Sequence, residues 1–224
     1  MGLMVFAIAI CLTLWAQWKV KSSFQKWSNV SSKTSLTGRE IARKILDQHG
    51  LTEVQIEPIR GFLTDHYDPT QKVVRLSNAV YENDSIAAIS VAAHECGHAI
   101  QHQQNYGALV LRHRLIPVFQ LTSGLAPWLL LAGIFFQITG LVLLGIIFFS
   151  IAVLFHLVTL PVEFNASSRA EQILLEQSLI DQDEKRGVRE VLGSAAFTYV
   201  ASALIALLEL LRYILIFLLQ RERE

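Results

Sequence analysis

The sequence predicts a mainly α-helical integral membrane protein, with about four transmembrane helices and a small cytoplasmic portion of mixed α and β structure. Hydrophobic residues make up 52% of the 224 residues, and the mean hydropathy is +0.41. This composition is too apolar for a typical soluble domain, whereas the charged residues in the middle of the chain exclude a protein that lies wholly in the bilayer. Long segments without charge account for the membrane-spanning part.

Four apolar segments are each long enough to cross a bilayer. Residues 1–18 carry no charge and end in tryptophan before Lys19. Because they begin without a basic region, they predict a retained anchor rather than a cleaved signal peptide. Residues 115–160 contain no Asp, Glu, Lys or Arg, and this length accommodates two helices of about 20 residues joined by a turn at 137–140. Residues 195–224 predict the fourth helix and a short tail.

Basic residues are distributed unevenly between the polar segments. Segment 19–114 contains 12 Lys or Arg residues and segment 161–194 contains 4, whereas the turn at 137–140 contains none and the tail contains only Arg221 and Arg223. Because basic loops stay on the cytoplasmic side, we expect both large polar segments to face the cytoplasm and the N-terminus to lie outside. The net charge is zero, from 19 basic and 19 acidic residues, which gives no indication of nucleic-acid binding.

One short motif carries chemistry. Residues 94–98 read His-Glu-Cys-Gly-His, the pattern H-E-x-x-H, within a segment that predicts a helix from Ile86 to Gln104. On a helix, positions i and i+4 lie one turn apart, so both imidazoles can reach one tetrahedral metal ion while Glu95 holds a water beside it. The expected number of accidental matches to this pattern in a chain of this length and composition is about 0.01. It predicts a zinc hydrolase, and the alternative is two helix histidines with ordinary hydrogen bonds. Cys96 points away from the histidine face and is expected to pack.

A catalytic zinc usually takes three protein ligands, so a third residue must join the two histidines. The predicted hairpin crosses the membrane twice and returns the chain to the side of the H-E-x-x-H helix, where Glu163 is the first acidic residue. His102 continues the histidine row, but about 12 Å along the helix separate it from His94, too far for one metal. Glu171 and Glu176 lie two to three turns further on. The alternative interpretation of Glu163 is a solvated charge at a helix end.

The segment before the motif predicts a helix followed by short strands. Residues 36–50 predict a helix that is capped by Thr37 and ends at a glycine. Residues 54–59 alternate like a strand, and residues 61–66 and 72–76 predict a hairpin around an Asp-Pro turn. An edge strand near a metal site could bind an extended peptide through main-chain hydrogen bonds, or the hairpin could only pack on the motif helix.

Five stretches of the chain resemble one known family: GFLTDHYDP, VVRLSNAVY, SIAAISVAAHECGHAIQH, TLPVEFNASSRA and AAFTYVASAL. They are similar to the YugP-type membrane zinc metallopeptidases of bacteria, and the resemblance covers nearly the whole chain. More distantly, the chain resembles the HtpX-like and CAAX prenyl-protease metallopeptidases, which also join H-E-x-x-H to a later glutamate after a membrane hairpin. The resemblance implies a zinc-dependent endopeptidase of the bacterial plasma membrane whose substrates are proteins or peptides, including membrane proteins.

The chain departs from the wider group at one position near the predicted ligand. In that group an aspartate stands four positions after the glutamate, whereas here that position is Ser167, so Asn165 or a group elsewhere in the fold is expected to orient a ligand. The oxyanion of the transition state also needs a hydrogen-bond donor. The sequence leaves three candidates open, namely Arg169, which follows Glu163 by six residues, and His66 or Tyr67 of the hairpin.

Together these features predict a zincin-like cytoplasmic portion, formed by the H-E-x-x-H helix of segment 19–114 and by a helix of segment 161–194. Zinc is expected to bind His94, His98 and Glu163. Glu95 is expected to act as the general base of peptide-bond hydrolysis.

Two other classes of function compete with this interpretation. A metal-binding membrane scaffold or chaperone-like protein has no need of Glu95, because a structural zinc site requires no base. A small transporter needs polar groups inside the membrane, and the predicted spans offer only His156 and the pair Glu209 and Arg212. These last two lie three positions apart on a helix, so we expect them to pair with each other.

Overall fold

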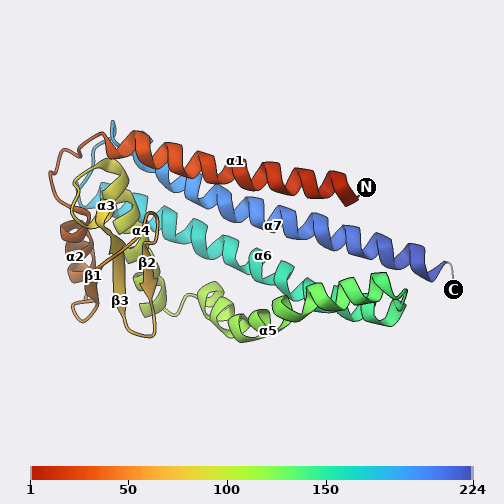
Figure 1. Ribbon diagram of the computed structural model, residues 1–224. Helices are drawn as coiled ribbons and strands as arrows, with labels where there is room; N and C mark the ends of the chain where they lie inside the picture. Colours follow the sequence, from red (N-terminus) through yellow and green to blue (C-terminus); the bar gives the residue numbers. More distant parts are fainter. Residues whose placement is uncertain (1, 223–224) are drawn as a thin grey trace. The chain divides into compact units, whose positions relative to one another are not determined.

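The computed structural model describes residues 2–222 and is mainly helical, with one small sheet (Figure 1). Met1 of the predicted anchor and Arg223 of the tail lie outside the described residues. The elements follow in the order α1 (Gly2–Ser28), α2 (Gly38–Gln48), β1 (Gln55–Ile59), β2 (His66–Asp68), β3 (Val73–Ser77), α3 (Asn78–Tyr81), α4 (Ile86–Gln103), α5 (Gly107–Phe135), α6 (Thr139–Glu176) and α7 (Lys185–Arg221).

Four helices of the described chain, α1, α5, α6 and α7, are long and apolar enough to cross a membrane. This confirms the expected number of candidate spans. The sequence places Thr139 and Gly140 in the turn after α5, but in the structure they begin α6. The turn is shorter because Gln137 adopts a left-handed backbone conformation, with φ at 57°, and the N–H of Ile138 bonds back to the carbonyl oxygen of Gly133 at 2.9 Å.

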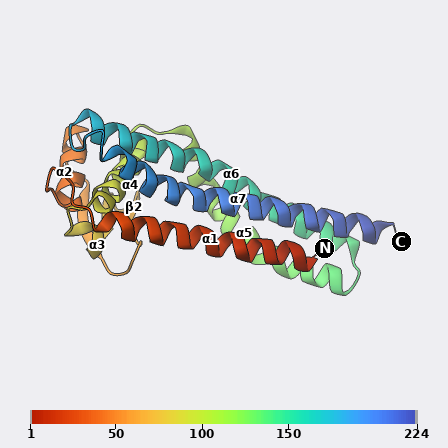
Figure 2. The same cartoon turned by 90° about the horizontal axis from the view of Figure 1, so that it is seen from above.

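The chain divides into two compact units. The membrane unit consists of Met1–Trp15, Ala108–Pro161 and Thr198–Glu224, and the sheet unit consists of Ala16–Gly107 and Val162–Phe197. The helices α1, α6 and α7 each contribute many residues to both units, and each is drawn as one ribbon in Figure 2. At 38 and 37 residues, α6 and α7 exceed the roughly 20 residues that one span requires.

Within the membrane unit, α5 and α6 approach closely at glycines. A Cβ atom at Gly133 would lie 2.6 Å from the backbone nitrogen of Val142, and one at Gly145 would lie 2.7 Å from Cγ of Leu130. Such contacts let neighbouring helix backbones meet inside a bilayer, where dispersion forces drive helix association. In α7, Arg212 Nη2 lies 2.5 Å from Glu209 Oε2, which confirms the expected pairing of these residues.

The hydrophobic core of the sheet unit forms around α4. The helix α2 packs against α4, and its residues Ile41, Ile45 and Leu46 are fully buried in this core. They repeat at helical spacing and so occupy one face of α2. The predicted cap is confirmed, because the Thr37 hydroxyl accepts the Glu40 N–H while the Glu40 carboxylate accepts the Thr37 N–H.

The sheet has the order β1-β3-β2, with β3 parallel to β1 and antiparallel to β2. The predicted hairpin is confirmed for β2 and β3. The prediction of a strand over residues 61–66 is wrong, because β2 covers only His66–Asp68. Gly61 and Leu63 have φ values of 123° and 56°, which interrupt an extended backbone. Both β2 and β3 pack against α4.

Candidate metal centre

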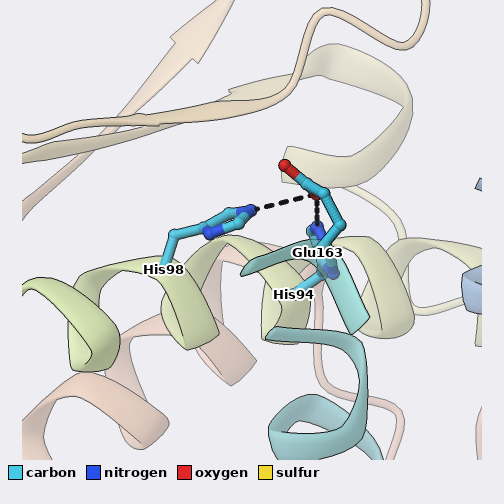
Figure 3. Close-up of side chains that lie close together, drawn as sticks. All are labelled: His94, His98 and Glu163. Carbon is cyan, nitrogen blue, oxygen red and sulfur yellow. Dashed lines mark ion pairs between the residues drawn. The ribbon is translucent and has the colours of Figure 1, made fainter. Parts of the chain in front are cut away.

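His94, His98 and Glu163 come together from two helices of the sheet unit. The helix α4 supplies the histidines and α6 supplies the glutamate, and Figure 3 shows both imidazoles directed at one carboxylate oxygen. Glu163 Oε2 lies 3.4 Å from His94 Nε2 and 3.5 Å from His98 Nε2. One potential ligand atom from each residue lies within 4.8 Å of the other two, so the group could hold a metal ion.

These separations fit shared coordination of a metal better than direct hydrogen bonds. In a tetrahedral site with metal bonds of about 2.0–2.2 Å, two ligand atoms lie roughly 3.3–3.6 Å apart. A direct N–H···O hydrogen bond brings its heavy atoms to about 2.7–3.2 Å. Two imidazole nitrogens and one carboxylate oxygen also form a donor set that zinc commonly takes. The three residues therefore fit a zinc ion.

Small residues allow α6 to lie close enough to α4 for this arrangement. Gly97 stands between the two histidines, and a Cβ atom there would lie 2.9 Å from the carbonyl oxygen of Ala166. Ala166 and Ala170 are fully buried. Because no side chain larger than a methyl group intervenes at this point, the two backbones meet and Glu163 comes within reach of both imidazoles.

Both acidic residues of the motif region are buried. Glu163 is 2% exposed and Glu95 is 7% exposed. A buried carboxylate is unfavourable unless positive charge or a metal compensates it. The interpretation of Glu163 as a solvated charge at a helix end is therefore wrong.

Each histidine has a different hydrogen-bond partner on its second ring nitrogen. Ser167 Oγ lies 3.2 Å from His94 Nδ1, and Gln101 Oε1 lies 3.0 Å from His98 Nδ1. Ser167 thus contacts a histidine although it lacks the carboxylate of the wider group. Asn165, which the sequence suggests as an orienting residue, contacts Gln101 rather than a histidine.

Comparison with known proteins shows the family of the chain. Residues 2–218 match the family described as "Putative neutral zinc metallopeptidase". The chain belongs to this family. A relative from Bacillus subtilis (strain 168), "Putative membrane protease YugP", is 58% identical over 216 residues, which cover 96% of each chain. No solved structure matches the chain.

Membership of this metallopeptidase family bears on the metal and on the class of reaction. The family's description names zinc and peptidase activity, and the name of the Bacillus relative adds a membrane location for that protein. The matched region contains all three residues of the cluster as well as Glu95.

A further carboxylate, that of the partly buried Asp65, lies near Glu95. Asp65 accepts hydrogen bonds from the backbone N–H and the hydroxyl of Ser77, at 2.7 and 3.1 Å. Burial raises the pKa of Asp65 above its ordinary value, and the nearby charge of Glu95 adds to this rise against the opposing effect of the Ser77 hydrogen bonds. Asp65 is not among the residues predicted from the sequence. The available signal was an acid inside segment 61–66, the first strand of the predicted hairpin.

Two of the predicted oxyanion donors make hydrogen bonds with residues other than His94, His98 and Glu163. His66 Nδ1 lies 2.9 Å from the carbonyl oxygen of Thr64. The Tyr67 hydroxyl lies 2.9 Å from His102 Nδ1, and the two residues line a pocket of about 210 Å³. Burial, with the nearby charges of Glu53 and Asp68, raises the pKa of Tyr67 to about 12.

The third candidate, Arg169, contacts other polar side chains. Its Nε donates to Asn165 Oδ1 and its Nη1 donates to Gln104 Oε1, both at 2.7 Å. Gln101, which was not predicted from the sequence, joins this group to His98. The spacing contained a signal, because Gln101 follows His98 by three residues and therefore lies beside it on the helix.

Cys96 packs as expected, and burial raises the pKa of its thiol.

Proposed function

We propose that this chain is a membrane-embedded zinc endopeptidase that hydrolyses peptide bonds of protein substrates. The ligands are His94, His98 and Glu163, and the general base is Glu95. The observation that supports this most strongly is the spacing of 3.4 and 3.5 Å between Glu163 Oε2 and the two imidazole nitrogens. Family membership supports zinc as the metal and peptide hydrolysis as the reaction. The arrangement is zincin-like, with both histidines and the base on one helix.

The residues of the chain divide the chemistry between them. Bound zinc supplies Lewis acidity, which lowers the pKa of a water toward about 7 and polarises the substrate carbonyl. Glu95 follows His94 directly in α4, so its carboxylate is available beside the ligands to take a proton from the attacking water. Glu95 then gives this proton to the amine nitrogen of the leaving peptide. The burial of Glu95 strengthens its electrostatic interactions.

The length of α6 supports cleavage at the point where the chain leaves the membrane. Glu163 lies about 36 Å along the helix axis from Thr139, which exceeds the roughly 30 Å of a hydrocarbon core. In the proposed topology, residues 1–18, 115–160 and 195–224 span the bilayer. Segments 19–114 and 161–194 lie in the cytoplasm because they hold most of the basic residues.

Exchanging Glu95 for Gln tests the general base. We expect Glu95→Gln to keep about one zinc per chain and to lose at least about 100-fold in peptide hydrolysis, because the change removes a proton acceptor and leaves all three ligands intact. The measurement is zinc content of the detergent-purified protein together with cleavage of casein. Loss of zinc in this variant would assign Glu95 to the ligand set instead.

Exchanging Glu163 for Gln tests the third ligand. Glu163→Gln retains the shape of the side chain but removes the charge that binds the metal, so zinc occupancy should fall markedly. His102→Ala is the matched control, since His102 lies one turn beyond His98 and bonds to Tyr67. It should keep its zinc. Zinc retained in Glu163→Gln and lost in His102→Ala would overturn the ligand set.

A further inference from the structure

His98 is the first member of a chain of hydrogen bonds that ends at Arg169. From His98 Nδ1 the chain passes over 3.0 Å to Gln101 Oε1. Gln101 Nε2 lies 2.8 Å from the carbonyl oxygen of Val162 and 2.9 Å from Asn165 Oδ1. Arg169 Nε lies 2.7 Å from the same Asn165 oxygen. The side chain of Gln101 is fully buried, so these groups rather than bulk water satisfy it.

The direction of each hydrogen bond follows from two groups, one that can only donate and one that can only accept. A guanidinium can only donate, so the Asn165 atom that Arg169 contacts must be the amide oxygen. A backbone carbonyl can only accept, so the Gln101 atom that faces Val162 must be the amide nitrogen. Both N–H bonds of that nitrogen are thereby used, one toward Val162 and one toward Asn165. The amide oxygen of Gln101 then faces His98, and it can only accept.

An acceptor at this position determines which ring nitrogen of His98 carries the hydrogen. Nδ1 must donate to Gln101, and in the neutral imidazole Nε2 is then the unprotonated nitrogen. Nε2 is also the atom that lies 3.5 Å from Glu163 Oε2, on the side where the cluster could hold a metal. We propose that Gln101, held by Val162, Asn165 and Arg169, is a positioning residue that fixes His98 in the tautomer whose Nε2 binds the metal.

The partner of the other histidine does not impose a tautomer in this way. His94 Nδ1 faces the hydroxyl of Ser167, which can donate or accept by rotating about its C–O bond. Of the two histidines, it is therefore His98 that is held in one tautomer before the metal arrives. This inference rests on the proposed function, since it assumes that the cluster is the zinc site.

Arg169 acquires a role different from oxyanion binding. Its Nε and Nη1 both donate to side-chain amides, which holds the guanidinium against Asn165 and Gln104. From this position it orients the Asn165 amide, and through that amide it reinforces the orientation of Gln101. Val162 holds Gln101 independently, so the loss of Asn165 or Arg169 should weaken the effect without abolishing it.

The test compares zinc affinity in variants of the full-length protein in detergent. Gln101→Met keeps an unbranched side chain of similar length but removes every hydrogen bond, and it should raise the Kd for Zn²⁺ by about 10- to 100-fold. Gln103→Met is the matched control, because exposed Gln103 on the same helix bonds to the carbonyl of His49, away from the cluster. It should leave the Kd unchanged. The Kd is measured with Zn²⁺ by competition against a chelator, without any substrate.

A second pair of variants keeps the test decisive if Gln101→Met fails to fold. Asn165→Asp preserves the acceptor oxygen for Gln101 and Arg169 and should bind zinc like the wild type, whereas Asn165→Leu should bind several-fold more weakly. The absorption bands of Co²⁺ in the site provide a second readout, since a different ring nitrogen on the metal shifts them. Unchanged Kd and unchanged bands in Gln101→Met, or equal Kd values for the two Asn165 variants, would overturn the proposal.

The outcomes also separate this inference from the proposed function. If the wild type binds no zinc, or if Glu163→Gln binds it equally well, the metal site itself is wrong. If Glu163→Gln loses zinc while Gln101→Met retains wild-type affinity, the metal site stands and the role of Gln101 is wrong.

Discussion

At the residue scale, the burial of acidic groups dominates the site. Glu163 and Glu95 are buried and Asp65 is partly buried, so each loses water contacts that a surface carboxylate keeps. The carboxylate of Glu163 faces two imidazoles, whereas that of Asp65 accepts two hydrogen bonds from Ser77. Because these bonds do not offset the burial, the charge of Asp65 should reduce the stability of the folded protein.

The destabilising effect of the Asp65 charge should appear in the pH dependence of the stability of the metal-free protein. The folded-state pKa of Asp65 lies above the unfolded value near 3.8, so the wild type loses stability as pH rises from about 3.8 through the folded pKa. Asp65→Asn has no such loss. Its Tm advantage over the wild type should grow across that window and then stay constant. Asp183→Asn, an exposed carboxylate, serves as the control, and a Tm difference for Asp65→Asn that shrinks with rising pH would contradict the argument.

The proximity of His94, His98 and Glu163 could be predicted from the sequence, but the contacts that α6 makes with His94 and Gln101 could not. Helical spacing sets the distance between His94 and His98, and the two membrane crossings predicted between them and Glu163 led us to expect this glutamate on their side. The contact of Ser167 with His94 and that of Gln101 with the Val162 carbonyl depend instead on how α6 is rotated about its own axis where it meets α4. No local pattern fixes such a rotation.

At the element scale, the close contact between α4 and α6 sets the geometry of the cluster. The absence of a side chain at Gly97 lets the backbone of Ala166 approach, and the same approach delivers Glu163 to the histidines. An added methyl group would meet backbone atoms, which cannot move aside as a flexible side chain can.

We therefore expect Gly97→Ala to destabilise the protein by about 1–3 kcal/mol and to lower zinc occupancy. Gly193→Ala in α7 is the matched control, because a Cβ atom there meets nothing within 4 Å. It should be neutral or stabilising by up to about 1 kcal/mol, as alanine is the better helix former. Thermal unfolding and zinc content of both variants provide the measurement. Equal behaviour of the two variants would show that the helix contact does not control the site.

The elements themselves were predictable to different degrees. The cap of α2 follows from Thr37, whose hydroxyl accepts a backbone N–H group in the structure. The parallel pairing of β1 with β3 was not predictable, because it joins residues that are distant in sequence. The segment before β2 was predicted wrongly, since left-handed residues such as Leu63 carry no sequence signature.

At the scale of the whole molecule, the proposed topology places both halves of the site on one face of the membrane. The histidines precede α5, and Glu163 lies in the second half of α6, so the site requires an even number of crossings between them. An odd number would separate the ligands by a bilayer.

Single cysteines should report this topology in intact bacteria. With Cys11 replaced by Ala, Glu53→Cys and Asp183→Cys should resist a membrane-impermeant maleimide until the cells are opened, whereas Gln137→Cys should react at once. Cys96 is buried and serves as the internal background. Opposite accessibility of positions 53 and 183 would be incompatible with the ligand set. Immediate labelling of both would reverse the orientation but leave the ligand set intact.

The boundary between the two units falls at Pro161, inside α6 and two residues before Glu163. Proline has no N–H to donate to the carbonyl of Leu157, so the helix lacks one of the bonds that resist bending. We expect α6 to be elastically softest at this point. Undulations of the surrounding lipid should then be absorbed as flexing at Pro161 rather than transmitted to the carboxylate, whose position the metal requires to within a fraction of an ångström. A helix with every hydrogen bond intact should couple the ligand more strongly to fluctuations of the bilayer.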